Sequence, residues 1–284
     1  MKTKKRYIPL IVTVLVCVAV VAVLLIWMKN DSQKVTSAQN QKAIKGLFQE
    51  KQEIVIDCLG DSITWGQYSS ADLQESIESG ETYVGLDDGG QLFEEFDIYV
   101  SSAYQSDPTY PEVLEAQLNS KLKENGLSNT VTVVNDGVSG DWITNKTYQR
   151  MTCDPDIVIL LMGGNNFYFD FPIPGMFEAN INALKEQGKI VYLVNYPLYT
   201  EGQHIQAFSD ANDYIASMAE KEKLPLIDLE TFFKQIQKKS ALSEKYGTYE
   251  IKELFSPDHI HLSEKGYELI GTYITDKLYS DIAS

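Results

Sequence analysis

Cysteine is scarce in this chain of 284 residues, which contains only Cys17, Cys58 and Cys153. Their spacing fits neither a zinc site nor a disulfide framework. Cys58 ends one predicted strand and Cys153 precedes another, so neighbouring parallel strands would hold these two sulfurs near opposite ends of a sheet. We therefore expect free, buried thiols. Cross-links are not required, because a chain of this length buries roughly 70 to 75% of its unfolded surface.

Positive charge is scarce as well, and the formal net charge at pH 7 is −16. Basic residues cluster at the N-terminus, which leaves the rest of the chain more acidic still. Binding to phosphate groups needs clustered Lys and Arg. The composition therefore argues against nucleic acid as a partner.

One long hydrophobic run is present, from Tyr7 to Met28, and it follows the basic residues 1–6. Its length is that of a membrane span. A cleaved signal peptide is the alternative, but it would have a shorter apolar core and a small-residue cleavage site, whereas this run ends in Ile-Trp-Met-Lys. We expect a retained single-pass anchor over residues 7–28. The positive-inside rule then places residues 1–6 in the cytoplasm and everything after Lys29 outside it, at the cell membrane.

Residues 29–52 are rich in Gln, Lys, Ser and Asn and contain few large apolar residues. This composition predicts a polar tether, within which a short helix remains open.

Short β-rich runs alternate with helical ones over residues 53–284, and no internal repeat is apparent. The expected strands are Ile54–Leu59, Thr130–Val134, Ile157–Leu161, Ile190–Asn195 and Leu224–Leu229. The expected helices are Pro111–Glu124, Gly175–Gln187, Ser209–Glu222 and one after Ser263. Continuous apolar strands belong to a parallel sheet covered on both faces. The alternation predicts a doubly wound α/β domain, whose ligands bind beyond the carboxyl ends of the strands.

Residues 67–108 interrupt this alternation, because they separate the first strand from its crossover helix by far more than the usual few residues. We expect an inserted subdomain or lid. It lacks Lys and Arg, and its acidic residues are Asp72, Glu75, Glu78, Glu81, Asp87, Asp88, Glu94, Glu95, Asp97 and Asp107. They indicate either a solvated surface that aids solubility or an acidic rim near the site that repels anionic substrates. Physiological salt would limit such repulsion to distances of ~8 Å.

Polar motifs follow three of the expected strands and precede the last expected helix. In chain order they are Gly60-Asp61-Ser62, Gly137-Val138-Ser139-Gly140, Gly163-Gly164-Asn165-Asn166 and Asp258-His259-Ile260-His261. Taken singly, each has an ordinary interpretation as a turn, a left-handed strand end or a surface histidine. Their common position at loops where an α/β domain carries its site favours a functional interpretation. Two of the three histidines of the chain lie in the last motif.

Together these four segments resemble the blocks of the GDSL, or SGNH, hydrolase family, which contribute Ser, Gly, Asn and an Asp-x-x-His pair in this order. The resemblance covers about residues 53 to 278. It implies a three-layer α/β/α, flavodoxin-like domain with a five-stranded parallel sheet. It also implies that Ser62 is the nucleophile, His261 the general base and Asp258 the carboxylate that orients the base. The N–H groups of Ser62 and Gly140 and the amide of Asn165 would form the oxyanion hole.

Physical chemistry gives the same roles to these residues. A serine hydroxyl is a poor nucleophile at neutral pH and needs an adjacent base, and imidazole titrates near the working pH. Asp258, three residues before His261, can accept from Nδ1–H and leave Nε2 facing Ser62.

Two positions depart from the family pattern, because Asn166 and Leu262 stand where members often have Asp and Pro. Neither side chain has a direct chemical role, so we expect the departures to bear on substrate positioning. The next segment, Phe-Tyr-Phe-Asp-Phe at residues 167–171, either lines an acyl pocket, stacks on a sugar or covers the core.

The expected reaction is hydrolysis of a carboxylic ester through an acyl-enzyme, without a metal or an organic cofactor. The expected substrate is a small acyl group, such as acetyl, on cell-surface or extracellular carbohydrate, and lipid esters remain open. An O-acyltransferase with the same triad is the second interpretation, and a catalytically silent surface-binding module is the third. The chemical competitor is a metal site built from Asp258, His259, His261 and Asp61. Spacing alone does not decide this, because a turn could separate two histidines that an extended segment would point the same way.

Overall fold

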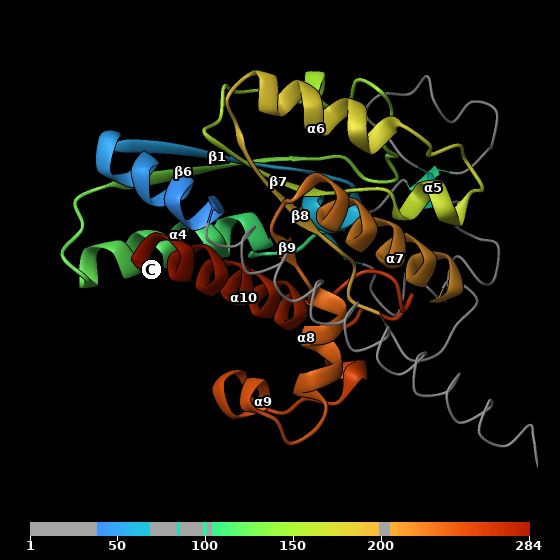
Figure 1. Ribbon diagram of the computed structural model, residues 1–284. Helices are drawn as coiled ribbons and strands as arrows, with labels where there is room; N and C mark the ends of the chain where they lie inside the picture. Colours follow the sequence, from blue (N-terminus) through green and yellow to red (C-terminus); the bar gives the residue numbers. More distant parts are fainter. Residues whose placement is uncertain (1–38, 69–83, 86–98, 101–103, 199–204) are drawn as a thin grey trace, which may run out of the picture.

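The computed structural model describes residues 39–68, 84–85, 99–100, 104–198 and 205–284 (Figure 1). The predicted anchor over residues 7–28, Cys17 and most of the predicted insertion lie outside these residues. None of the helices within the described ranges combines the length and the apolar character that a membrane span requires.

A sheet of five parallel strands forms the centre of the fold. Its strands are β1 (Glu53–Gly60), β6 (Thr130–Gly137), β7 (Ile157–Leu161), β8 (Ile190–Val194) and β9 (Leu226–Ile227). Their order in space is β6-β1-β7-β8-β9, and every neighbouring pair is parallel. The predicted five-stranded parallel sheet is thus confirmed. The strand order reverses at β1, which is where ligands bind in flavodoxin-like sheets.

Strand boundaries differ from the prediction by one residue at β1 and β8, and by more at β6 and β9. β6 continues three residues beyond Val134, paired with β1 as far as Gly137. β9 is shorter than the predicted run of residues 224–229, because the Asp228 side chain caps helix α8 (Leu229–Ile236) by accepting from the Thr231 N–H. A residue that caps a helix leaves the strand conformation before the sheet can continue.

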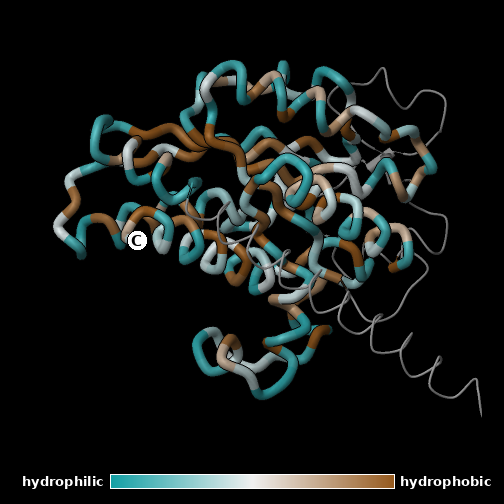
Figure 2. The backbone as a smooth tube through the Cα atoms, in the orientation of Figure 1, coloured by the Kyte–Doolittle hydropathy of each residue, from teal (hydrophilic) through white to brown (hydrophobic). Residues whose placement is uncertain are grey.

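Helices cover both faces of the sheet (Figure 1). α4 (Tyr110–Glu124) packs against α10 (Glu264–Ala283) on one face. α6 (Met176–Glu186) and α7 (Ile205–Glu222) cover the other. α8 lies with α10, since the rings of Phe232 and Tyr273 stack at 4.0 Å, and α9 (Ala241–Tyr246) follows it. The hydrophobic residues concentrate in the strands between these layers (Figure 2), as in β7, where all five residues are buried.

Residues 39–50 form a helix, which is the short helix that remained open within the polar tether predicted over residues 29–52. Ile44 and Phe48 belong to the hydrophobic core, and Leu47 packs against it. These residues are three and four positions apart, so they share one face of the helix. The helix is fastened to α10 by Gln41, which donates to Asp281. The domain therefore begins before residue 53, and three apolar residues in a polar stretch were the signal for it.

The two ends of the predicted insertion meet in a short ladder. β2 (Gln67–Tyr68) pairs antiparallel with β5 (Tyr104–Gln105), and β3 (Val84–Gly85) pairs with β4 (Tyr99–Val100). The chain thus leaves and re-enters the α/β domain at one place. Of the acidic residues named above, only Asp107 lies within the described residues.

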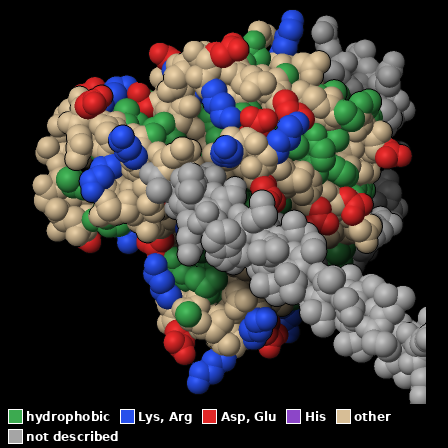
Figure 3. Space-filling view, in the orientation of Figure 1, with side chains coloured by type: hydrophobic (Ala, Val, Ile, Leu, Met, Phe, Trp, Pro, Cys, Tyr) green, Lys and Arg blue, Asp and Glu red, His purple; other side chains and the backbone are tan. Residues whose placement is uncertain are grey.

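The two cysteines of the described residues are free, as predicted. Cys58 is buried in β1, but Cys153 is only half-buried because it lies in the loop before β7, so the expectation of a buried thiol was wrong there. On the face shown in Figure 3, acidic and basic side chains are interspersed. Ion pairs join α6 to α7, including Lys185 with Glu222 and Lys221 with Glu178.

Candidate active site

Ser62 lies where β1 ends and the short helix α2 (Ser62–Trp65) begins. The Asp61 side chain caps this helix by accepting from the Ile63 N–H at 3.0 Å. Gly60 lies so close to the Thr64 side chain and the Leu161 carbonyl that a Cβ at this position would collide with both. The strand therefore delivers the serine in a tight turn at the carboxyl edge of the sheet, beside β7.

His261 lies between Ser62 and Asp258. The Ser62 Oγ is 2.8 Å from His261 Nε2, and His261 Nδ1 is 2.6 Å from Asp258 Oδ2. These contacts define the tautomer, because an ionised carboxylate only accepts. Nδ1–H donates to Asp258, and Nε2 is left to accept the Ser62 hydroxyl proton. The structure thus brings together the three residues that the sequence assigned to the triad.

Hydrogen bonds within residues 256–261 hold the loop that carries the base. Asp258 Oδ1 accepts from the Ser256 hydroxyl and from the N–H groups of Ile260 and His261, at 2.8 to 2.9 Å. The Ser256 N–H donates to the His261 carbonyl at 2.8 Å. Burial alone would raise the pKa of Asp258, but the contact with His261 and these two N–H groups hold it well below its usual range. Asp258 is therefore ionised at any pH at which His261 works as a base.

The two histidines of this motif have different surroundings. His259 adopts a left-handed conformation, with φ of 60°, so the segment turns instead of running extended. Its side chain is exposed, whereas that of His261 is mostly buried. Both ring nitrogens of His261 are already engaged. Within the described residues, no group of three or more His, Cys, Asp or Glu side chains is arranged to hold a metal ion.

Of the three predicted oxyanion residues, Ser62 follows β1, whereas Gly140 and Asn165 come from the segments after β6 and β7. Gly140 adopts φ of 71°, in the left-handed region that favours glycine. Asn165 lies in α5 (Gly164–Tyr168), and its Nδ2 donates to the Asp141 carbonyl at 2.7 Å. The loop of Gly140 is also tied to the nucleophile turn, since the Val138 N–H donates to the Gly60 carbonyl. All three predicted donors therefore lie at one edge of the sheet, and the amide of Asn165 keeps one hydrogen for a ligand.

The two departures from the family pattern occupy structural positions. Asn166 is buried, and its Oδ1 accepts from the Ile143 N–H at 2.9 Å while Nδ2 donates to the Ile143 and Pro172 carbonyls. It thereby fastens the chain just after Gly140. Leu262 is fully buried in the core and forms a bridge with Phe255 that closes the base loop.

Tyr196 is a component of the site that sequence reasoning missed. It follows β8, and its hydroxyl donates to Asp61 Oδ2 and accepts from the Gly164 N–H. Burial raises the pKa of Asp61 to about 6, against the hydrogen bonds from Tyr196 and Ile63. One phenol thus joins the turn of Ser62 to the helix of Asn165. Its position at the carboxyl end of a fourth strand was the available signal.

The aromatic residues after Asn165 pack on one another and on neighbouring elements. Phe167 packs against the hydrophobic core, as the core-covering interpretation requires. Phe171 lies 4.8 Å from the ring of Trp142, next to Asp141. Tyr168 stacks on Phe208 and is 37% exposed.

The model of the GDSL-like lipase/acylhydrolase family matches residues 58–269. Solved structures of low sequence identity share the fold. A two-domain esterase (CEX) active on acetylated mannans is 18% identical, over 86% of this chain and 53% of that chain, with a TM-score of 0.50. LAE5, an α/β hydrolase from the metagenome of Lake Arreo in Spain, is 18% identical over 82% and 97%, also with a TM-score of 0.50.

The acetyl xylan esterase AlAXEase is 17% identical over 79% of this chain and 99% of that chain, with a TM-score of 0.49. A search of the curated proteins finds no match. The family match takes in well over half of the chain and includes every loop that bears a predicted site residue. The chain therefore belongs to the GDSL-like lipase/acylhydrolase family and is an esterase of the GDSL, or SGNH, type.

Proposed function

We propose that the protein is a serine esterase that cleaves carboxylic esters through an acyl-enzyme, with Ser62 as the nucleophile. The observation that carries this is the continuous path from the Ser62 hydroxyl through the His261 ring to the Asp258 carboxylate. Such an arrangement converts a weak nucleophile into an attacking alkoxide equivalent without building charge on the serine in the ground state.

Each step can be assigned to an atom. His261 Nε2 takes the proton of Ser62 as Oγ attacks the acyl carbon, and Asp258 stabilises the imidazolium that forms. The carbonyl oxygen becomes an oxyanion, which the N–H groups of Ser62 and Gly140 and the free Nδ2 hydrogen of Asn165 stabilise. His261 then returns the proton to the departing alcohol. Water, activated by the same nitrogen, releases the acid and restores Ser62.

The proposed substrate is an acetyl group or another small acyl group on extracellular carbohydrate. Two observations support it. Residues 7–28 have the length and the basic flank of an anchor that would hold the domain outside the cytoplasm. A two-domain esterase active on acetylated mannans is among the solved structures that share this fold.

A fluorophosphonate probe tests the nucleophile. We expect the probe to label the wild-type protein, and the Ser62→Ala variant to lose labelling while retaining its melting temperature. Ser139→Ala is the matched control, since Ser139 also lies in a loop at this edge of the sheet and bonds Gln67 instead of a base. Persistent labelling of the Ser62→Ala variant would show that another residue is the nucleophile.

Acetate release from acetylated xylan or mannan tests the substrate class, with p-nitrophenyl acetate as the reference ester.

Membrane fractionation tests the anchor. We expect the protein to remain with membranes at high salt, and we expect added protease to release the domain. A soluble species that begins shortly after Met28 without added protease would favour cleavage instead.

A further inference from the structure

The chain contains 24 Lys and Arg residues in total, and Arg150 is the only arginine after Arg6. Elsewhere in residues 7–284 the chain uses lysine. The two are not equivalent, because guanidinium presents donors in a rigid planar fork, whereas an ammonium acts as a compact point charge. A position that takes arginine alone among so many lysines points to a need for that fork.

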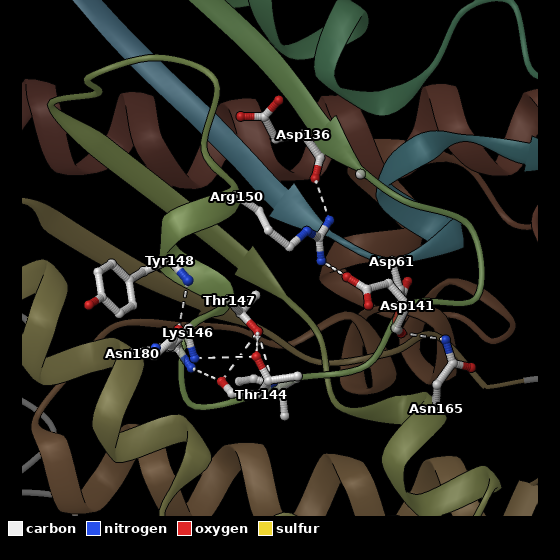
Figure 4. A network of polar contacts seen from close by, with 12 residues as sticks. Asp61, Asp136, Asp141, Thr144, Lys146, Thr147, Tyr148, Arg150, Asn165 and Asn180 are labelled. Carbon is white, nitrogen blue, oxygen red and sulfur yellow. Dashed lines mark hydrogen bonds and ion pairs between the residues drawn. The ribbon is translucent and has the colours of Figure 1, made fainter. Parts of the chain in front are cut away.

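The backbone of Arg150 is fixed in place. Arg150 ends the short 3-10 helix η1 (Thr147–Arg150). Asn180 of α6 is fully buried and holds this turn at two points, since its Oδ1 accepts from the Tyr148 N–H at 2.7 Å and its Nδ2 donates to the Thr144 carbonyl at 2.6 Å (Figure 4). The guanidinium therefore projects toward the sheet from a rigid base.

The fork of Arg150 bridges the two ends of the loop that carries Gly140. Its Nη1 forms an ion pair with Asp141 Oδ2, directly after Gly140. Its Nη2 donates to the Asp136 carbonyl near the end of β6, at 3.4 Å (Figure 4). Two donors of one planar group thus reach both sides of the loop formed by residues 137–140, which a single ammonium would do less well.

Asp141 connects the loop held by Arg150 to the side chain of Asn165. The Asp141 carbonyl accepts one hydrogen of Asn165 Nδ2 at 2.7 Å, and this contact sets the plane of the amide (Figure 4). Because the amide group is planar, this contact also fixes the direction of the second N–H bond of Asn165 Nδ2. The guanidinium itself touches neither Ser62 nor Asn165 in any contact of the described residues.

The surroundings of Arg150 keep it charged. Burial lowers the pKa of Arg150, but the carboxyl groups of Asp136, Asp61 and Asp57 oppose the shift. An arginine in such an acidic setting remains protonated at any pH at which the protein folds. The guanidinium therefore keeps its positive charge at the carboxyl group of Asp141.

We infer that Arg150 is a positioning residue for the oxyanion hole, which acts by fixing the Gly140 loop and, through Asp141, the amide plane of Asn165. This inference rests on the proposed esterase function. It assigns to Arg150 no contact with substrate and no proton transfer.

The Arg150→Met variant tests it, because Met fills similar space without donors. With p-nitrophenyl acetate as the probe substrate, we expect kcat to fall by about 10²-fold, with KM changed less than about threefold, as for loss of a preorganised donor. Arg150→Lys should recover part of kcat, since it keeps the charge without the fork. Lys189→Met is the matched control, because it removes a mostly buried cation from its pair with Asp154 at the opposite edge of the sheet and should leave kcat unchanged.

A double-mutant cycle separates positioning from general stability. In an Asn165→Ala background, Arg150→Met should cost about tenfold or less in kcat, because one of the two groups it positions is gone and only the Gly140 loop remains to be held. The inference would be overturned if the fold-losses of kcat caused by Arg150→Met and Asn165→Ala simply multiplied in the double variant. It would also be overturned if Arg150→Met alone kept the wild-type kcat. If the Met variant does not fold, Arg150→Lys carries the same cycle. A wild-type protein that neither reacts with fluorophosphonate nor hydrolyses the ester would instead overturn the proposed function, and this inference with it.

Discussion

The two halves of the site are held in place in different ways. The base half, residues 256–261, is fastened from within, because Asp258 Oδ1 alone accepts three hydrogen bonds from its own loop. The oxyanion half depends on distant elements: Asn166 holds Ile143, and Asn180 holds the turn that carries Arg150. A catalytic base can therefore be encoded in one short motif, whereas an oxyanion hole must be assembled by the fold.

This difference predicts how each half responds to substitution. Changes far from His261 should leave the base in place. By contrast, residues that never touch substrate should affect the oxyanion half through the loops they hold.

The largest effect is expected in the base half, where two neighbouring histidines can be compared. His261→Ala should lower kcat by on the order of 10³-fold or more, since its Nε2 is the base that takes the proton of Ser62. His259→Ala should cost at most about tenfold, because His259 is exposed and lies across the turn. Both are measured as steady-state ester hydrolysis, with and without a chelator. Equal losses together with sensitivity to the chelator would favour the metal site.

In the oxyanion half, Asn165→Ala should lower kcat by ~10² to 10³-fold with little change in melting temperature. The residue is half-buried, and among the described residues its amide is seen to donate to the Asp141 carbonyl alone. Its free hydrogen is used mainly in the transition state. If kcat stays at the wild-type value, Asn165 does not belong to the oxyanion hole.

The next residue should behave in the opposite manner. Asn166→Ala leaves the buried N–H and carbonyl of Ile143 without partners, which costs roughly 1 to 3 kcal/mol of folding free energy. At about 2 to 4 °C per kcal/mol, thermal unfolding should detect this loss. The fall in kcat should be about tenfold, smaller than for Asn165→Ala, because the donor itself remains. An unchanged melting temperature with a large fall in kcat would reverse the roles of the two asparagines.

The same difference explains how far the sequence predicts the structure. The strands were located correctly because continuous apolar runs such as Ile157–Leu161 have one stable position in a doubly wound sheet. Ser62, Asp258 and His261 were identified from short motifs, and the structure brings them within hydrogen-bonding distance. Short sequence patterns therefore predict the parts of the structure that are stabilised by residues close in the sequence.

Residues that act across the fold left no such pattern. Arg150, Asn180 and Tyr196 acquire their roles only when helix packing and strand order bring them beside loops that are distant in the chain. The helix over residues 39–50 was only left open for a related reason, because its apolar face of Ile44, Leu47 and Phe48 is short and becomes buried only against the folded core.

A buried carboxyl lies beneath the oxyanion half and offers the smallest test. Asp57 lies within β1, near Asp136, and Cys153 Sγ donates to its Oδ2 at 3.5 Å. Burial raises the pKa of Asp57 to about 8, and Asp136 adds to the shift. Because the folded state holds this proton more tightly than the unfolded chain, the resulting stability is complete below the unfolded pKa near 4 and is lost as pH rises through about 8.

Asp57→Asn keeps a neutral donor at this position and removes the titration. The variant should therefore gain melting temperature over the wild type as pH rises from 5 to 8, by at least ~3 °C, and the gain should level off above pH 8. Asp154→Asn is the control: Asp154 is exposed, and the hydrogen bond from Lys189 lowers its pKa, so the carboxylate is ionised across this whole range. A constant difference between Asp57→Asn and wild type from pH 5 to 8 would show that Asp57 is ionised in the folded state throughout. The Asp57 carboxylate would then be charged near Arg150, whose guanidinium would have to offset that charge as well as hold the Gly140 loop.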